Sequence, residues 1–129
     1  MELIFECTIP GRPYLKKSTA SMVGGGRRKR LIYSVQYREW EFRALYEIKR
    51  KLGFVNQKFP FKGRVRLECK FCFENHQAEP DLSACYEGIQ DTLQRAGVIE
   101  NDKQIFSHDG STKVFGGPAQ TIVKIFAIG

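Results

Sequence analysis

Acidic side chains gather in one short part of a strongly basic chain. The stretch over residues 78–104 reads AEPDLSACYEGIQDTLQRAGVIENDKQ, and its acids include Asp81, Glu87, Asp91, Glu100 and Asp102. The whole chain has 21 Lys and Arg, 14 Asp and Glu and a net charge of +7, which favours a polyanionic partner, nucleic acid first. Mg²⁺ needs only one or two carboxylates together with water. Acids within a basic surface are therefore the charge layout of a metal-dependent nuclease, where bases hold phosphates and carboxylates hold the metal.

A structural interpretation of the same acids stays open. Apolar residues recur with helical spacing after Asp81 and predict a helix over 82–96 that stops at Gly97. Asp81 would be its N-cap, worth about 1 kcal/mol, and Glu87 and Asp91 would lie on its exposed face. Two like charges at i, i+4 cost a helix a few tenths of a kcal/mol, so stability alone does not explain this pair. Gly88 costs about 1 kcal/mol relative to Ala, which suggests that a ligand needs the space beside it.

The segments EPDLS and QDTLQRAGVIENDKQI resemble the RusA family of Holliday-junction resolvases, which is found in phages and prophages. The family core reads roughly (R/K)-x-D-L-D-N-L-x-K, then D-A-L, then a glycine turn and D-D-x-Q-(I/V). Asp81 matches its first acid, Asp91 opens the counterpart of D-A-L, and Asp102 with Gln104 matches the end of the last motif. The resemblance is detailed over residues 80–105 and plausible over the rest, where Lys113 matches a lysine of the late strand.

The chain departs from the family pattern at the acids themselves. Ser83 replaces the second aspartate, Ala84 the asparagine, Asn101 the first acid of D-D, and Glu87 the catalytic lysine of the best-known members. In one interpretation, Glu87 supplies the missing carboxylate from one turn along the same helix face. In the other, the site is damaged and the protein binds DNA junctions without cutting them. The lost positive charge would have to come from Lys103, Lys113 or the basic loop.

The resemblance implies an α+β fold, in which two main helices pack on a small mixed β-sheet, and a homodimer that cuts four-way DNA junctions with Mg²⁺ or Mn²⁺. We expect Asp81 and Asp102 as metal ligands, Glu87 as a third acid and Asp91 as a further catalytic acid. We expect a set of basic residues to hold DNA: Lys16, Lys17, Arg27, Arg28, Lys29, Arg30, Lys103 and Lys113. A phage or prophage origin, with action in the cytoplasm of a bacterial host, follows from the resemblance alone. A regulatory protein whose basic surface meets another protein is the remaining alternative.

Cysteines and histidines offer two further chemistries. Cys69 and Cys72 form a C-x-x-C, but strand alternation would point them to opposite faces, and no second pair of ligands is spaced to complete a zinc site. Structural thiols are therefore expected. His108 follows the acids closely, and it is either a general base or an exposed loop residue.

The elements that must position these residues are expected in the order strand, short strand, helix, strand, helix, strand, strand. The strands cover residues 2–9, the segment KRLIYS, residues 64–74, STKVF and QTIVKIFAI. The first helix covers 35–52, with Ser34 as its cap and Gly53 as its stop. Residues 11–28 are expected to form a long exposed loop, and a hairpin at GGP is expected to join the last two strands.

The length of 129 residues predicts one domain over residues 1–129. The first residues, MELIFECTIPG, lack the bases and the long apolar run of a signal peptide. No stretch approaches the ~20 apolar residues of a membrane span. We therefore expect a soluble intracellular protein with no membrane partner.

Overall fold

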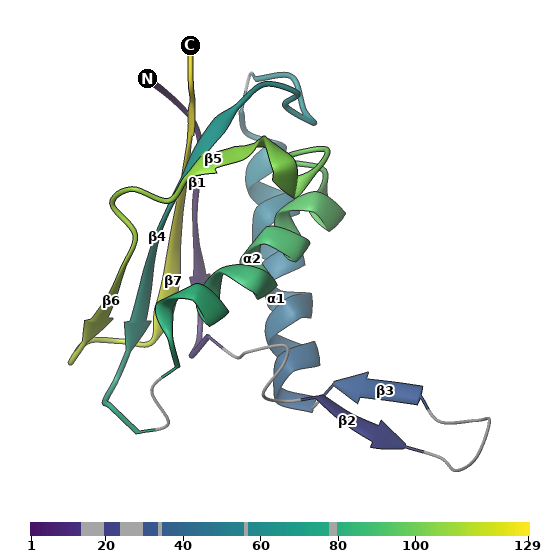
Figure 1. The fold of residues 1–129 in the computed structure, drawn as a ribbon, viewed down its shortest axis with the longest axis vertical. Helices are drawn as coiled ribbons and strands as arrows, with labels where there is room; N and C mark the ends of the chain where they lie inside the picture. Colours follow the sequence, from purple (N-terminus) through teal and green to yellow (C-terminus); the bar gives the residue numbers. More distant parts are fainter. Residues whose placement is uncertain (14–19, 24–29, 34, 56, 78–79) are drawn as a thin grey trace.

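The computed structural model describes residues 1–13, 20–23, 30–33, 35–55, 57–77 and 80–129, with the backbone alone over 20–23 and 30–33. Its fold is a small α+β arrangement of a mixed five-stranded sheet and two helices (Figure 1). The strands are β1 (Glu2–Pro10), β2 (Ala20–Val23), β3 (Arg30–Tyr33), β4 (Val65–Phe73), β5 (Ile105–Ser107), β6 (Thr112–Phe115) and β7 (Gln120–Ala127). The helices are α1 (Val35–Leu52), α2 (Leu82–Ala96) and the short 3₁₀ helix η2 (Asp102–Gln104).

The sheet is built around β4 and β7. β7 pairs antiparallel with β1 on one side and with β4 on the other. The far edge of β4 carries two short parallel strands, β5 beside its beginning and β6 beside its end. β2 and β3 form a separate two-stranded sheet.

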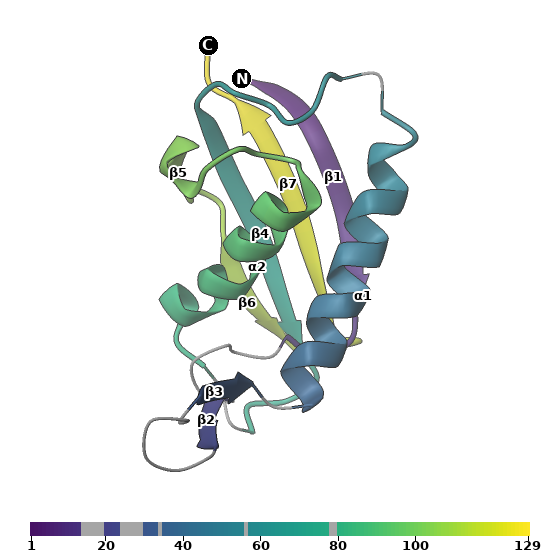
Figure 2. The same cartoon turned by 90° about the vertical axis from the view of Figure 1, so that its right-hand side faces the viewer.

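Both helices cover the same face of the sheet (Figure 2). The face of β4 that points towards them alternates as expected, because Val65, Leu67, Cys69, Phe71 and Phe73 are all buried. α1 buries Tyr37, Trp40, Ala44 and Ile48, and α2 buries Cys85, Gly88, Ile89, Thr92 and Leu93. A single hydrophobic core therefore lies between the sheet and the two helices.

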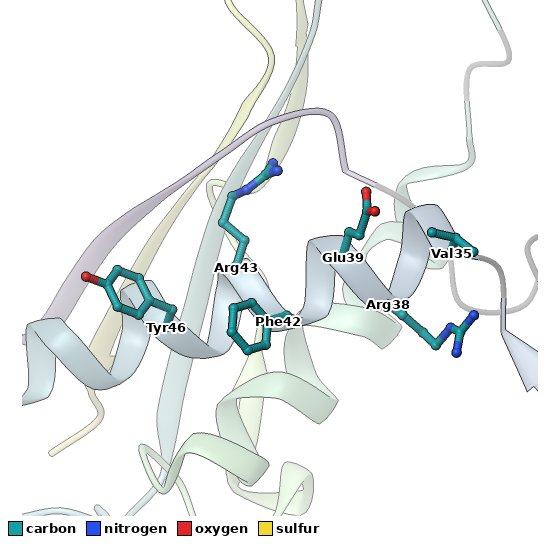
Figure 3. Close-up of a pocket in the computed structure, with 6 residues that line it drawn as sticks. All are labelled: Val35, Arg38, Glu39, Phe42, Arg43 and Tyr46. Carbon is teal, nitrogen blue, oxygen red and sulfur yellow. The ribbon is translucent and has the colours of Figure 1, made fainter.

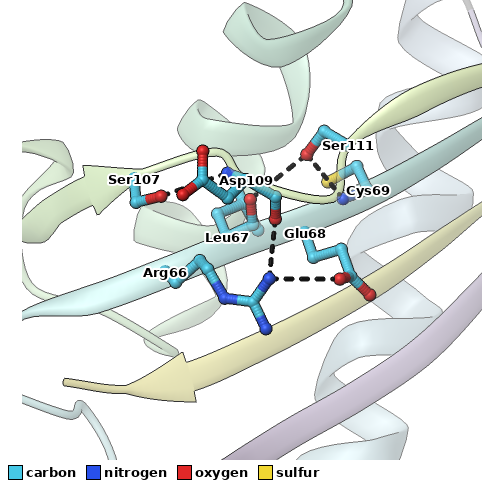
Figure 4. A network of polar contacts seen from close by, with 7 residues as sticks. All are labelled: Arg66, Leu67, Glu68, Cys69, Ser107, Asp109 and Ser111. Atoms are coloured by element: carbon cyan, nitrogen blue, oxygen red, sulfur yellow. Dashed lines mark hydrogen bonds and ion pairs between the residues drawn. The ribbon is translucent and has the colours of Figure 1, made fainter. Parts of the chain in front are cut away.

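A polar network fastens the loop between β5 and β6 to β4 (Figure 4). The Arg66 side chain donates to the carbonyl oxygen of Asp109 at 2.8 Å and to a Glu68 carboxylate oxygen at 3.3 Å. The Ser111 hydroxyl accepts from the backbone N–H of Cys69 at 3.0 Å and donates to the carbonyl of Leu67 at 3.3 Å. This hydroxyl bonds the backbone of β4 between the part that pairs with β5 and the part that pairs with β6. It therefore helps to hold both short strands at the same edge of β4.

The structure confirms most of the predicted elements. Both helices have the predicted bounds, and Gly97 ends α2 in the left-handed conformation at φ 83°. The predicted loop over 11–28 is wrong at Ala20–Val23, which form β2 against β3. The expected hairpin at GGP is also wrong, because β6 pairs with β4 and not with β7. Ser34, the expected cap of α1, lies outside the described residues.

No helix in the described part of the chain is long and apolar enough to cross a membrane.

Candidate functional site

Asp81 stands at the N-terminus of α2 with an exposed side chain. Its backbone occupies the N-cap position, where its carbonyl accepts from the N–H groups of Ala84 and Cys85, but its carboxylate makes no capping hydrogen bond. The structural interpretation of Asp81 as a side-chain cap is therefore wrong. The carboxylate is not used to satisfy the first turn of α2.

Lys113 approaches the same end of α2 from β6. Its Nζ donates to the carbonyl oxygen of Pro80 at 3.0 Å, and Pro80 directly precedes Asp81. Both charges affect the pKa of the Cys85 thiol. Burial raises this pKa to about 11, the charge of Lys113 acts to lower it, and the charge of Asp81 acts to raise it. The structure thus brings a predicted metal ligand and a predicted DNA-binding lysine to one place.

Asp102 lies at the other end of α2. It begins η2, and its backbone N–H donates to the side-chain oxygen of Gln94 in the last turn of α2, at 3.2 Å. A helix of 15 residues is about 22 Å long at ~1.5 Å per residue. One chain therefore places Asp81 and Asp102 at opposite ends of a helix and not at one metal ion.

The two acids within α2 have different surroundings. Glu87 is exposed, and it lies six positions after Asp81, about 9 Å along the helix axis. Asp91 lies 3.6 Å from Arg95, whose Nη1 also contacts Glu41 of α1 at 2.5 Å. Asp91 is therefore part of a charged bridge between the two helices and is only partly exposed, whereas the structural interpretation of the sequence placed it on an exposed helix face.

Within the described residues, we find no group of three or more His, Cys, Asp and Glu side chains that could hold a metal ion. The four predicted acids are instead distributed along α2. A single chain offers the carboxylate chemistry that Mg²⁺ prefers, but it does not assemble these carboxylates in one place.

Gly88 does not leave room for a ligand. A Cβ built on it would lie 3.4 Å from Cζ3 of Trp40 and 3.7 Å from Cε1 of Tyr37. The space beside Gly88 is filled by the α1 side chains, and Gly88 is itself buried. The small residue serves the close approach of α1 and α2, which contradicts the expectation of a ligand gap.

Gln104, which matches the glutamine of the family motif, has a structural role. Its Oε1 accepts from the N–H groups of Glu100 and Asn101 at 2.8 and 2.9 Å, and its Nε2 donates to the carbonyls of Phe61 and Gly63 at 2.7 and 2.9 Å. This side chain joins the loop before β4 to the loop that carries Asp102. It fixes the surroundings of Lys103, one of the predicted DNA-binding residues.

A basic groove lies beside Gln104, and the sequence did not predict it. It is lined by Lys62, Gly63, Arg64, Lys103, Gln104, Phe106, Ile128 and Gly129. The sequence signal was present in the bases of FKGR and in a phenylalanine that follows the acidic loop. The two segments lie about 40 positions apart in the sequence, and only the fold places them together.

Most of the predicted basic loop lies outside the described residues. Lys16, Lys17, Arg27, Arg28 and Lys29 lie outside the described residues, and Arg30 opens β3 with only its backbone described. Of the predicted DNA-binding residues, Lys103 and Lys113 have described side chains. They lie at the two ends of α2: Lys103 follows Asp102, and Lys113 contacts Pro80, the residue before Asp81.

A second groove runs over the outer face of α1, opposite its buried face (Figure 3). Its lining includes Val35, Phe42 and Tyr46, which are 55%, 75% and 60% exposed. Arg38, Glu39 and Arg43 complete the lining. None of the predicted site residues lies there, and its large exposed side chains are typical of a surface that contacts another macromolecule.

His108 is only partly accessible. Its ring stacks on Tyr86 with 3.9 Å between the ring centroids. Burial lowers the pKa of His108, and a hydrogen bond with the backbone of Leu67 opposes this shift. The histidine packs on Tyr86 of α2 and is not the freely exposed loop residue that one interpretation expected.

All four cysteines are free and buried. Burial raises the pKa of Cys7 to about 12 and also raises that of Cys69 and Cys72. Thiols that stay protonated and buried pack as apolar side chains. Both thiols of the C-x-x-C are buried, as structural thiols would be, and Cys72 lies in β4 between its pairings with β6 and β7.

Comparison with known proteins adds no relative. No protein-family model matches the chain, and no curated protein matches it. The case for a function therefore depends on the chain's own residues and on their resemblance to the RusA motif.

Proposed function

We propose that the protein is a Mg²⁺-dependent, structure-selective endodeoxyribonuclease that resolves four-way junctions or other branched DNA in recombination and repair, as a RusA-like homodimer. The observation that carries the proposal is that Asp81 and Lys113 lie at the same end of α2, its N-terminus. The carboxylate is not used as a helix cap, and a lysine ammonium is anchored one residue away. A carboxylate and an ammonium at one end of a helix suit a metal and a phosphate oxygen respectively.

The donor set fits Mg²⁺ in kind. Mg²⁺ takes one or two carboxylates and keeps several waters, so Asp81 with one further acid is sufficient. Bound Mg²⁺ would supply an activated water and electrostatic stabilisation of the charge that develops on the cleaved phosphate. Lys113 and Lys103 would hold the strand by its phosphates.

The spacing of the acids supports a homodimer. Asp81 and Asp102 lie at the two ends of α2, so one ion can contact both only if they come from different chains. A two-fold dimer places residue i of one chain against residue j of the other and repeats the contact, which gives two equal sites. Glu87 remains the alternative second acid within one chain, where a side chain must span about 9 Å of helix rise to reach the ion beside Asp81.

The test is cleavage of a labelled, immobile four-way DNA junction by the purified protein in Mg²⁺, in Mn²⁺ and in EDTA, with a linear duplex of the same sequence beside it. We expect paired nicks in opposite strands of the junction, lost in EDTA and in Asp81→Asn. Glu100→Gln is the matched control, because Glu100 is an exposed acid of the same stretch that is not a proposed ligand. Tight junction binding without nicks in either metal would instead support a junction binder that has lost catalysis.

A second candidate function is a regulatory protein that binds another protein. The groove on α1 favours it, because Phe42 and Tyr46 are exposed on a helix face that the fold does not cover. This candidate predicts equal affinity for branched and linear DNA. Competition between the unlabelled junction and linear duplex for the protein separates the two functions.

A further inference from the structure

The groove beside η2 combines positive charge with an open aromatic ring. Lys62, Arg64 and Lys103 line it, and none of its eight lining residues is acidic. The ring of Phe106 is 62% exposed, and the Arg64 guanidinium carbon lies 5.0 Å from its centroid. One side of the ring is thus next to a cation, while most of its surface faces solvent.

Hydrogen bonds of the lining residues Gln104 and Ile128 hold the groove in shape. Gln104 donates to the carbonyls on both sides of Lys62, those of Phe61 and Gly63. The N–H of Ile128 donates to the carbonyl of Arg64 at 2.9 Å, which fastens the same segment to the end of β7. Because these bonds join three separate segments, the backbone that carries the cations and the ring is fixed before any ligand arrives, and binding costs less ordering entropy.

We propose that this groove binds an unpaired nucleotide of a DNA strand, with its base stacked on Phe106 and its neighbouring phosphates held by Lys62, Arg64 and Lys103. A positive groove with an exposed aromatic side chain is the arrangement by which proteins bind single strands without reading their sequence. A base within an intact duplex has no free face to stack, so the ligand is a single strand or the splayed strand at a branch. An acidic peptide could use the three cations, but it would leave the aromatic ring unmatched.

The groove adjoins the loop that carries Asp102, since Lys103 is the next residue. This site deepens the proposed nuclease function and rests on it for its biological meaning: the groove would hold the unpaired strand beside one of the proposed metal ligands. Its binding chemistry needs no metal, so it can be measured separately from cleavage.

The experiment measures fluorescence anisotropy of a labelled oligothymidylate with the full chain in EDTA, over a range of salt concentrations. Phe106→Ala should weaken binding by about ten-fold or more, the loss expected when one stacked base loses its aromatic partner. Phe54→Ala is the matched control, because Phe54 is 78% exposed and lies outside the groove. It should bind as the unaltered protein does.

Replacing Lys62, Arg64 and Lys103 together by Gln should weaken binding and reduce the slope of log K against log salt by about 2, at ~0.7 per phosphate contact on a single strand. The control removes the same charge from the end of α1 by changing Lys49, Arg50 and Lys51 to Gln, and it should leave most of that slope. Circular dichroism checks that each variant is folded.

A further variant tests stacking directly. The single native tryptophan, Trp40, is buried, so Phe106→Trp introduces an exposed indole whose emission the oligonucleotide should quench, with affinity retained.

The inference is overturned if Phe106→Ala and the triple groove variant bind like their controls. It is also overturned if poly-glutamate displaces the oligonucleotide from the unaltered protein and from Phe106→Ala equally well. Normal junction cleavage by groove variants with normal affinity would sink this inference alone, whereas strand binding without any cleavage would sink the nuclease function alone.

Discussion

Asp81 and Asp102 are separated by the length of α2, with Asp81 at its N-cap and Asp102 held to Gln94 of its last turn. Two ligands of one Mg²⁺ ion each lie about 2.1 Å from it, whereas the helix between these acids is roughly 22 Å long. The two acids that agree best with the RusA motif therefore cannot serve one ion within a chain. If both are ligands, the functional unit has two chains.

This separation predicts complementation between two inactive variants. Asp81→Asn and Asp102→Asn should each lose junction cleavage, since each removes one ligand from both sites of the dimer. After the two proteins are mixed and allowed to exchange subunits, half of the dimers should be mixed, and one of the two sites in each should hold both carboxylates. Cleavage should then return to about a quarter of the unaltered level, measured on the labelled junction.

The control for complementation mixes Asp81→Asn with a double variant that lacks both acids. No arrangement of these chains gives a site with both carboxylates, so cleavage should stay absent. If the first mixture is also inactive although subunit exchange is demonstrated, the two acids do not share an ion, and Glu87 becomes the required second ligand.

Asp91 gives a prediction in the opposite direction. Its carboxylate is 32% exposed and lies 3.6 Å from Arg95, which also contacts Glu41. Partly exposed ion pairs contribute about 0.2–1 kcal/mol, so Asp91→Asn should lower the free energy of unfolding by less than about 1 kcal/mol and leave cleavage unchanged. Urea unfolding of Asp91→Asn, Glu41→Gln and the double variant measures the coupling through Arg95. Loss of cleavage in a normally stable Asp91→Asn protein would show that Asp91 acts in catalysis.

Gly88→Ala should stabilise the protein by about 0.5–1 kcal/mol, because alanine favours the helix by about 1 kcal/mol over glycine. The new methyl group meets Trp40 at 3.4 Å, which is ordinary van der Waals contact. Gly88→Leu should be destabilising by about 1–3 kcal/mol, since the larger side chain must displace the Trp40 ring. Both are measured by urea unfolding. A Gly88→Ala protein that is more stable but no longer binds DNA would show that the space beside Gly88 has a functional use after all.

The helices could be predicted from the sequence because local signals agree with the fold. The apolar period of α2 and the glycine that follows it specify one helix with a defined end, and Gly97 does adopt the positive φ that this requires. The neighbours of β6 could not be predicted in this way. GGP between two short apolar runs resembles a hairpin, but β6 prefers the free edge of β4, where residues Lys70 to Phe73 accept it as a parallel strand. That choice depends on which edge the rest of the fold leaves open.

The acids illustrate the same limit for the site. Their residue types suggest metal chemistry, but spacing along a helix decides which of them can meet, and α2 separates Asp81 from Asp102 whatever their identity. Gln104 could be recognised as part of a motif, yet its four hydrogen bonds to two loops emerge only once residues 61–63 lie beside η2. The groove that contains Phe106 depends on the same long-range contact and has no local signature.

The four thiols should resist modification in the folded state. Burial raises the pKa of Cys7 to about 12 and that of Cys85 to about 11, and the thiolate is the reactive form. A disulfide reagent at mildly alkaline pH should therefore react slowly with the native protein and rapidly with all four thiols in denaturant. Fast reaction of Cys69 and Cys72 in the native protein would contradict their structural role.

His108 should make the folded state less stable in mild acid. Burial lowers its pKa in the folded protein, whereas an unfolded histidine binds its proton near pH ~6.5. The unfolded state therefore binds more protons, so this contribution to stability is complete above about pH 6.5 and is lost as the pH falls below it. His108→Gln should reduce the fall in unfolding free energy between about pH 7.5 and pH 5.5, relative to the unaltered protein. His76→Gln is the control, because the native His76 ring is exposed and stacks on Phe115. Junction cleavage by His108→Gln is the second readout, because a general base would be lost with the imidazole whereas a packed ring would be replaced without loss of catalysis.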